Sequence, residues 1–196
     1  MKLRRGFKKE ASELAEEVRG ELRLGPFDCL DPRRLAQHLE IPIIPLSEYS
    51  DICKDAQYLF SIEPDAFSAV TVFDNHQRLI MHNDSHSVPR QNSNLAHELS
   101  HGLLLHEPAA ALDKKTGCRI WDPTNEEEAD WLAGELLVTN KMALAVARGR
   151  FTPQHAMTKL CVSRQMLEWR LNMTGAFKRV QFEKAKRRKR RKIVSR

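Results

Sequence analysis

The sequence predicts an α+β fold in which a small antiparallel sheet packs on a mostly helical body. The β-rich runs are few and confined to residues 41–82, whereas apolar residues at helical spacing occupy most of the rest. The 196 residues are 41% apolar and contain no long apolar run, which excludes collagen-like, low-complexity and membrane-spanning chains. This size fits one domain, which we expect at residues 1–178, followed by a basic tail at 179–196.

The N-terminal helices follow from residue spacing and from helix breakers. Residues 8–23 carry apolar side chains three and four positions apart, which predicts an amphipathic helix that ends before Gly25 and Pro26. Asp31 is suited to the N-cap and Pro32 to the first helical position, so a second, short helix is predicted to begin there.

The predicted strands come next. Residues 41–46 contain two prolines, which cannot donate ladder hydrogen bonds, so this run is predicted to be an edge strand. The runs 66–73 and 78–82 are β-rich and separated by a polar segment, which predicts a hairpin. The pattern of residues 47–65 is ambiguous.

The second half of the chain is predicted to be helical. One helix is expected at 94–106, and a longer one at about 125–148. Thr152 and Ser163 are suitable N-cap residues, so each is predicted to begin a further short helix.

The positive charge is concentrated in the tail. The formal net charge is +6, but residues 178–196 hold 11 Lys or Arg against one acid, Glu183, which leaves 21 basic and 25 acidic residues in the body. Seven consecutive cations repel one another, which predicts a disordered extension. They are Lys186, Arg187, Arg188, Lys189, Arg190, Arg191 and Lys192. The extension either is simply solvated or attracts nucleic acid without sequence specificity.

The cysteines indicate a reducing compartment. Cys29, Cys53, Cys118 and Cys161 stand far apart without a CxxC pair, in a chain large enough to form a core without disulfides. We therefore expect reduced thiols and a cytoplasmic location. We also expect no membrane association, because the chain contains no long apolar run.

The segment from His97 to His101 matches the pattern HExxH. Helix positions four apart differ by about 40° around the axis, so His97 and His101 project side by side and can bind one metal ion. Glu98 then lies beside the metal, where its carboxylate can take a proton from the metal-bound water and pass it to a leaving amine. The alternative is a helix whose two histidines only cap or pack.

A catalytic zinc needs a third protein ligand and an open position. The helix predicted after the motif supplies a candidate, because Glu126 lies on a stripe at helical spacing that includes the small residues Ala129 and Ala133. Glu126 is favoured over Glu128 as the third ligand, because Glu126 lies on this stripe and Glu128 does not. The alternative is an acidic first turn that only interacts with the helix dipole.

The motif is embedded in a longer pattern. It comprises Ile80-Met81-His82-Asn83 after a β-rich run, Arg90, Ala96 to Leu105 around HExxH, and Glu126-x-x-Ala129-x-x-Leu132-Ala133-x-x-Leu136-Leu137. This pattern resembles that of the ImmA/IrrE family of metallo-endopeptidases, over about residues 8–175. The chain departs from the family pattern at Ser100, at residues 92–94 and at residues 138–139, none of which is a predicted ligand.

The resemblance implies a minimal zincin-like metallopeptidase. It implies that His97, His101 and Glu126 hold one zinc ion and that Glu98 is the catalytic base. It also implies a protein substrate, a helix-turn-helix repressor or antitoxin, and therefore a role in transcription regulation on a mobile element. Manganese or iron would suit the same ligands.

The path of the substrate is predicted only in outline. An extended peptide would pair with the edge of the hairpin that precedes the metal helix. The residue that stabilises the oxyanion is not assigned, because Tyr58, His82, His106 and His155 are candidates by residue type alone.

Two other functions stay open. Residues 152–156, 160–163 and 166–171 could form two helices joined by a tight turn, as in a helix-turn-helix unit that binds DNA. The apolar residues Met166, Leu167 and Leu171 favour a packed closing pair of helices instead. The chain could also be a non-proteolytic binding module that retains the peptidase fold.

Overall fold

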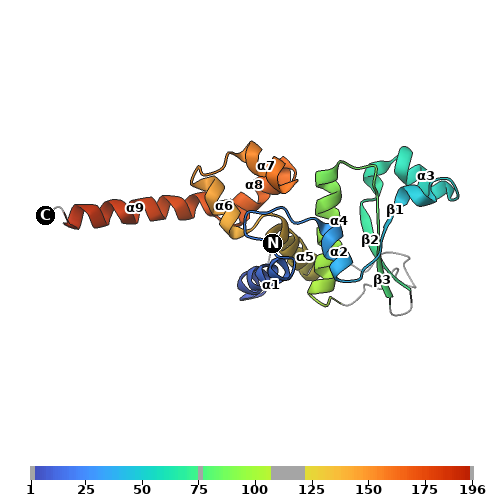
Figure 1. Ribbon diagram of the computed structural model, residues 1–196, viewed down its shortest axis with the longest axis horizontal. Helices are drawn as coiled ribbons and strands as arrows, with labels where there is room; N and C mark the ends of the chain where they lie inside the picture. Colours follow the sequence, from blue (N-terminus) through green and yellow to red (C-terminus); the bar gives the residue numbers. More distant parts are fainter. Residues whose placement is uncertain (1–2, 75–76, 107–121, 195–196) are drawn as a thin grey trace.

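The structure is a computed structural model that describes residues 3–74, 77–106 and 122–194. Its α-helices are α1 (Phe7–Glu21), α2 (Pro32–His38), α3 (Lys54–Ser61), α4 (Val88–Leu103), α5 (Pro123–Leu137), α6 (Asn140–Ala147), α7 (Pro153–Leu160), α8 (Arg164–Met173) and α9 (Ala176–Val194). Its strands are β1 (Ile43–Pro45), β2 (Ala69–Asp74) and β3 (Gln77–His82), and its 3-10 helices are η1 (Leu46–Tyr49) and η2 (Pro64–Ala66). The predicted α+β class is confirmed, with a small sheet at one end of a helical body (Figure 1).

The three strands form a mixed sheet in the order β1-β3-β2. The predicted hairpin is confirmed, since β2 and β3 are antiparallel with Thr71 opposite Ile80. The prediction of an antiparallel sheet is wrong for β1, which runs parallel to β3 with Ile43 opposite Ile80. Two parallel neighbours need a long connection between them, and the chain from β1 to β3 provides one through η1, α3, η2 and β2. Most of this connection, residues 47–65, has an ambiguous sequence pattern.

Helix α4, which contains the HExxH motif, lies between the sheet and α5 (Figure 1). It begins at Val88, six residues before the predicted start at 94. Pro89 is tolerated because it sits in the first turn, where its missing N–H is not needed. The polar residues of that turn obscure the helical pattern, yet Gln91 and Asn92 are buried and hydrogen-bond backbone carbonyls of neighbouring loops.

The helix predicted at 125–148 is two helices, α5 and α6. The break falls at Val138 and Thr139, where the backbone leaves the helical region. The hydroxyl of Thr139 accepts a hydrogen bond from the backbone N–H of Met142 at 3.0 Å, so Thr139 is the N-cap of α6. The two short helices predicted after it are confirmed as α7 and α8, capped by Thr152 and Ser163.

Two clusters of buried side chains hold the helices together. One joins α1, α2, β3, α4 and α5 through residues such as Phe7, Ile80 and Leu132. The other joins α5 to the closing helices α6 to α9 through residues such as Met142 and Leu167. Because α5 belongs to both clusters, it fixes the closing helices relative to α4.

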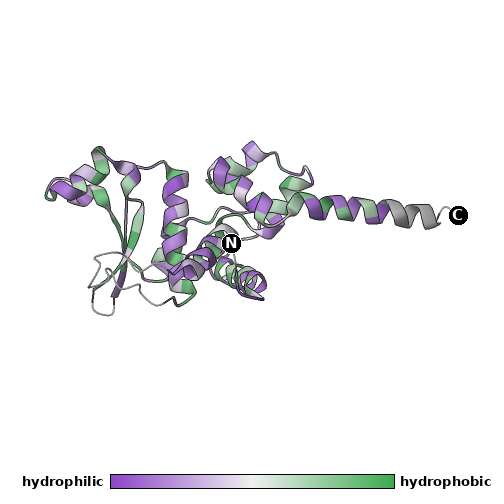
Figure 2. Cartoon of the chain, turned by 180° about the vertical axis from the view of Figure 1, so that it is seen from behind, coloured by the Kyte–Doolittle hydropathy of each residue, from purple (hydrophilic) through white to green (hydrophobic). Residues whose placement is uncertain are grey.

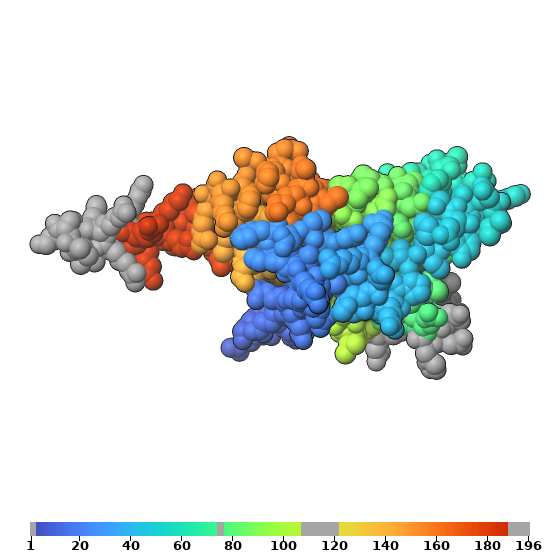
Figure 3. All heavy atoms as spheres, viewed as in Figure 1, coloured from blue at the N-terminus to red at the C-terminus, as the bar shows by residue number. Residues whose placement is uncertain are grey.

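Residues 176–194 form helix α9, which projects away from the body (Figure 1). Figure 3 shows the same projection for the coloured part of the helix. The sequence predicts a disordered tail from residue 179, whereas the structure has a helix over residues 179–194. Burial of Ala176 and Val180 against the body fixes the first turn of α9. Lys and Arg are good helix formers, so the helix continues beyond this turn. Much of α9 is hydrophilic (Figure 2), and Glu183 pairs with Arg148 of the body at 2.9 Å.

A transmembrane helix is absent from the described ranges, where no helix combines the length and the apolar composition needed to cross a bilayer.

Candidate metal centre

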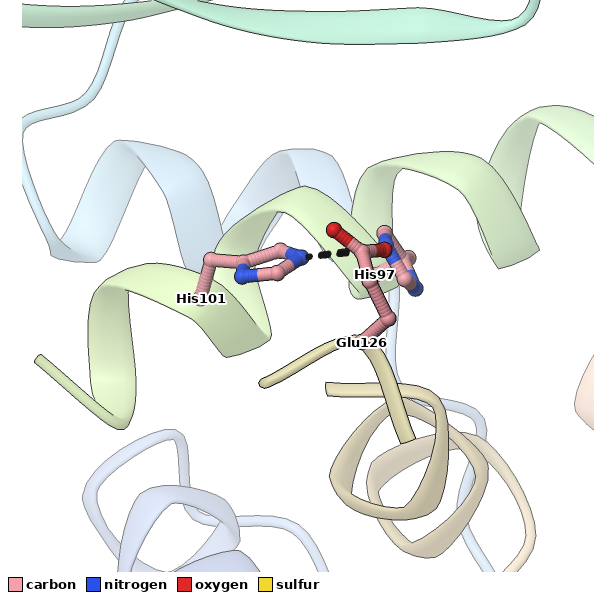
Figure 4. Close-up of side chains that lie close together, drawn as sticks. All are labelled: His97, His101 and Glu126. Carbon is pink, nitrogen blue, oxygen red and sulfur yellow. Dashed lines mark hydrogen bonds and ion pairs between the residues drawn. The ribbon is translucent and has the colours of Figure 1, made fainter. Parts of the chain in front are cut away.

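Helices α4 and α5 bring His97, His101 and Glu126 together. The two histidines lie one turn apart on α4, and Glu126 lies in the first turn of α5, which packs against α4. Figure 4 shows the three side chains converging on one point from the two helices. Their side chains are 24%, 20% and 19% exposed, so the cluster lies at the surface of the fold and is open to solvent.

The distances between the three donor atoms fit a tetrahedral zinc ion. The Nε2 atom of His97 lies 3.1 Å from Nε2 of His101 and 3.1 Å from Oε2 of Glu126. The third side of the triangle, from Nε2 of His101 to Oε2 of Glu126, is 3.7 Å. Ligands about 2.0–2.1 Å from a tetrahedral zinc are separated from one another by about 3.3 Å, so the residues fit the ion.

Each histidine is oriented through its other ring nitrogen. Nδ1 of His97 lies 2.9 Å from Oδ1 of Asp130, and Nδ1 of His101 lies 3.0 Å from Nδ1 of His106. Both contacts leave Nε2 directed at the shared point. Such outer hydrogen bonds fix the tautomer and ring orientation of metal-binding histidines.

Glu128 lies in a different set of contacts from Glu126. Its Oε1 accepts a hydrogen bond from Nε of Arg4 at 2.9 Å, and its Oε2 lies 3.7 Å from Nε2 of His106. Within the described residues, Glu128 is thus connected to His101 through His106. Of the two acids weighed as third ligand, Glu126 is the one that lies against both histidines.

Glu98, the predicted base, is held by the sheet. Its side chain leaves α4 on the side that faces β2, and the hydroxyl of Thr71 donates a hydrogen bond to Oε2 at 2.5 Å. Glu98 is buried, and among the described residues no hydrogen bond occupies its other oxygen, Oε1. Within these residues, Oε1 is therefore left without a hydrogen-bond donor.

The electrostatics of the cluster favour a cation. Burial lowers the pKa of His97, but hydrogen bonds with Asp130 and Glu126 outweigh it and raise this pKa to about 10. Burial raises the pKa of Glu126, but hydrogen bonds with the two histidines outweigh it and hold this pKa well below its ordinary value. Burial and the neighbouring His101 lower the pKa of His106 to about 4. The side chains around His97 and Glu126 therefore stabilise positive charge, which a bound divalent metal ion would provide.

Of the four residues considered for the oxyanion, His106 lies at the cluster, through its contact with His101. Tyr58 is exposed on α3, and His155 stacks on Phe151 with ring centroids 5.6 Å apart. His82 is buried at the end of β3, where the charges of Arg33, Asp84 and His86 act on it.

Asp130 and Thr71 were not identified by sequence reasoning. Asp130 has a signal in the sequence, because it follows Glu126 by four residues and so lies on the same face of a helix. Thr71 has none, since its contact with Glu98 depends on how the hairpin packs on α4.

Comparisons with known proteins identify the family of the chain. Residues 65–172, more than half of the chain, match the Peptidase M78 family, described as the IrrE N-terminal-like domain. The matched segment contains the sheet hairpin, HExxH and Glu126. A search of curated proteins finds no match. The resemblance noted from the sequence is thereby confirmed, and the chain belongs to the Peptidase M78 family, a family of metallopeptidases.

Proposed function

We propose that this protein is a zinc-dependent endopeptidase. The observation that supports the proposal best is the convergence of three donor atoms, from His97, His101 and Glu126. Glu98, the next residue along α4, is close enough for its charge to act on His97. Three protein ligands at a solvent-accessible site are typical of catalytic zinc, whereas structural zinc sites are closed by four.

In the proposed reaction, the residues of the site have different roles. Zinc held by His97, His101 and Glu126 would supply Lewis acidity, polarising the carbonyl group of the scissile bond and making water at the site more acidic. Thr71 holds Oε2 of Glu98, so Oε1 takes the proton of the attacking water as the water oxygen bonds to the carbonyl carbon. Oε1 then passes this proton to the amide nitrogen, and the C–N bond breaks to release a carboxylic acid and an amine.

The substrate that we propose is a protein segment bound in extended form. Strand β2 is one edge of the described sheet, and its residue Thr71 contacts Glu98. A peptide that pairs with the free edge of β2 would therefore have its carbonyl groups near Glu98. The further proposal that this segment belongs to a helix-turn-helix repressor or antitoxin rests on the resemblance to ImmA/IrrE proteins.

We propose in addition that α9 attracts nucleic acid without sequence specificity. The helix projects from the body, and its exposed cations include Lys178, Lys184, Lys186 and Arg187. Such a contact would bring the peptidase near a DNA-bound substrate. The free thiols of Cys29, Cys53 and Cys161 fit the cytoplasmic location expected for this role.

A DNA-binding role for α7 and α8 themselves has less support. Arg170 of α8 is fully buried and donates hydrogen bonds to Glu135 and to the carbonyl of Val138, so it is not available to a DNA groove. The exposed face of α8 carries an ion pair between Arg164 and Glu168 at 2.7 Å. A helix that reads DNA would present unpaired cations there.

The endopeptidase proposal is tested by cleavage of a mixed peptide library. Zinc-loaded wild-type protein and the Glu98→Gln variant are incubated with the library, and new peptide termini are identified by mass spectrometry. We expect cleavage by the wild type and a loss of at least about 100-fold in the variant, because the proton acceptor is removed. Cleavage by neither protein, although both bind zinc, would contradict the proposal and favour the binding-module alternative.

A further inference from the structure

Arg78 places a guanidinium group on α4, near the proposed base. Arg78 lies opposite Phe73 in the hairpin, on the same face of the sheet as Thr71. Its guanidinium occupies the space over Gly102, where an added β-carbon would overlap Nη1 and would lie 3.2 Å from Cζ. The ring of Phe73 supports it, with Cζ 5.1 Å from the ring centroid. The missing side chain at Gly102 is therefore what lets Arg78 reach α4.

Arg78 differs from the other arginines of comparable burial. In residues 3–74, 77–106 and 122–194, four further arginines are buried or half-buried, and each donates hydrogen bonds to carbonyl, amide or carboxylate oxygens. They are Arg19, Arg33, Arg90 and Arg170. Arg78 is half-buried, yet within the same ranges it has neither a hydrogen-bond acceptor nor an ion-pair partner within 4.0 Å. The exposed N–H groups of such a cation are satisfied by water, and an acceptor on a ligand could take the place of that water.

The position of Arg78 relates it to the reacting bond. Gly102 and Glu98 are four residues apart on α4, so the guanidinium lies about one helical turn, roughly 5–6 Å, along the helix from Glu98. An extended peptide advances about 3.3 Å per residue. A group held by Arg78 would thus belong to a residue about two positions from the scissile bond.

We infer that Arg78 binds a carboxylate of the substrate, either an Asp or Glu side chain about two positions from the scissile bond or the carboxylate at a chain end. A planar guanidinium with free N–H groups suits bidentate recognition of a carboxylate. The charged group that acts on Arg78 among the described residues is the acid Glu98, so a preference for a carboxylate at this position would come from Arg78 itself. This inference rests on the proposed function, because it presumes that a peptide binds beside Glu98.

The inference is tested by binding of peptide hydroxamates, which do not need to be cleaved. In one matched pair the hydroxamate replaces the C-terminal carboxylate of the peptide, and in the other it is at the N-terminal end of a peptide whose C-terminus is amidated. The members of each pair differ only in Glu or Gln two positions from the hydroxamate. A fifth probe has the hydroxamate at its N-terminal end, Gln at that position and a free C-terminal carboxylate. Each is titrated by calorimetry into zinc-loaded wild-type protein, Arg78→Gln, Arg78→Lys and the control Arg164→Gln, whose arginine is exposed on α8.

We expect wild-type protein and Arg164→Gln to bind at least one carboxylate-bearing probe about tenfold more tightly than its neutral partner. The preference should disappear in Arg78→Gln and persist in part in Arg78→Lys, and the probe that shows it identifies a side-chain or a terminal carboxylate. Equal binding of charged and neutral probes by the wild type, a preference that survives Arg78→Gln, or zinc-loaded protein that binds no probe would overturn the inference. A wild type that binds no zinc would instead refute the proposed function.

Discussion

Oδ1 of Asp130 lies 2.9 Å from Nδ1 of His97, and Asp130 follows Glu126 by one turn of α5. One helix therefore provides both a proposed ligand and the carboxylate that orients another proposed ligand on α4. The packing of α4 on α5 thus determines the geometry of the whole cluster.

Removal of Asp130 should weaken zinc binding. In Asp130→Ala the ring of His97 loses the acceptor that fixes its tautomer, and we expect the zinc dissociation constant to rise about 10- to 100-fold. Competition with a chromophoric chelator measures this constant. The control is Glu168→Ala, which removes an exposed acid of α8. Equal zinc affinities for Asp130→Ala and the control would show that Asp130 does not orient the ligand.

Loss of the Thr71 hydroxyl should impair the proton transfer and leave the metal in place. Thr71→Val keeps the shape of the side chain but removes the hydrogen bond to Oε2 of Glu98, so kcat should fall about tenfold with unchanged zinc content. Thr71→Ser should recover most of the rate. Peptide cleavage kinetics with elemental analysis of each variant provide the measurement, and a wild-type kcat in Thr71→Val would argue against a role for this contact.

The buried ion pair between Arg170 and Glu135 should be important for stability. Both side chains are almost fully buried, where α8 packs on α5. Glu135→Gln leaves the Arg170 charge without its counter-ion, and we expect a loss of about 3–5 kcal/mol in the free energy of unfolding. The double variant Glu135→Leu, Arg170→Met should lose less, because no unpaired charge remains. Urea unfolding measures both, and a loss below about 1 kcal/mol in Glu135→Gln would contradict this account.

The cations of α9 should determine any affinity for nucleic acid. Replacement of Lys184, Lys186 and Arg187 by Gln should weaken binding to duplex DNA at low salt, and the dependence of affinity on salt should become shallower by about 0.9 per lost phosphate contact. Fluorescence anisotropy over a series of salt concentrations measures both changes. An unaltered salt dependence would mean that α9 does not contact the DNA.

The fold was largely predictable where local patterns decide it. Apolar spacing predicted α1, the Asp31 cap and Pro32 predicted the start of α2, and the β-rich runs predicted the hairpin. The direction of β1 was not predictable, because it depends on the crossover through residues whose own pattern is ambiguous. The start of α4 was misplaced because buried polar residues such as Gln91 interrupt its apolar pattern.

Part of the candidate site was likewise predictable from the sequence, and part was not. His97 and His101 follow from helical spacing, and Glu126 follows from a stripe that the structure buries at Ala129 and Ala133. Their roles as ligands stay predictions. The contacts of Thr71 and Arg78 were not predictable, because each joins the hairpin to α4 and depends on how the two elements pack.

The metal content of the purified protein tests the central claim most directly. Wild-type protein, His97→Ala and Glu98→Gln are offered zinc, dialysed against metal-free buffer and analysed by elemental mass spectrometry. The account predicts about one zinc per chain in the wild type and in Glu98→Gln, and little in His97→Ala, because His97 supplies a ligand and Glu98 does not. Wild-type protein without stoichiometric metal, or His97→Ala with as much zinc as the wild type, would contradict it.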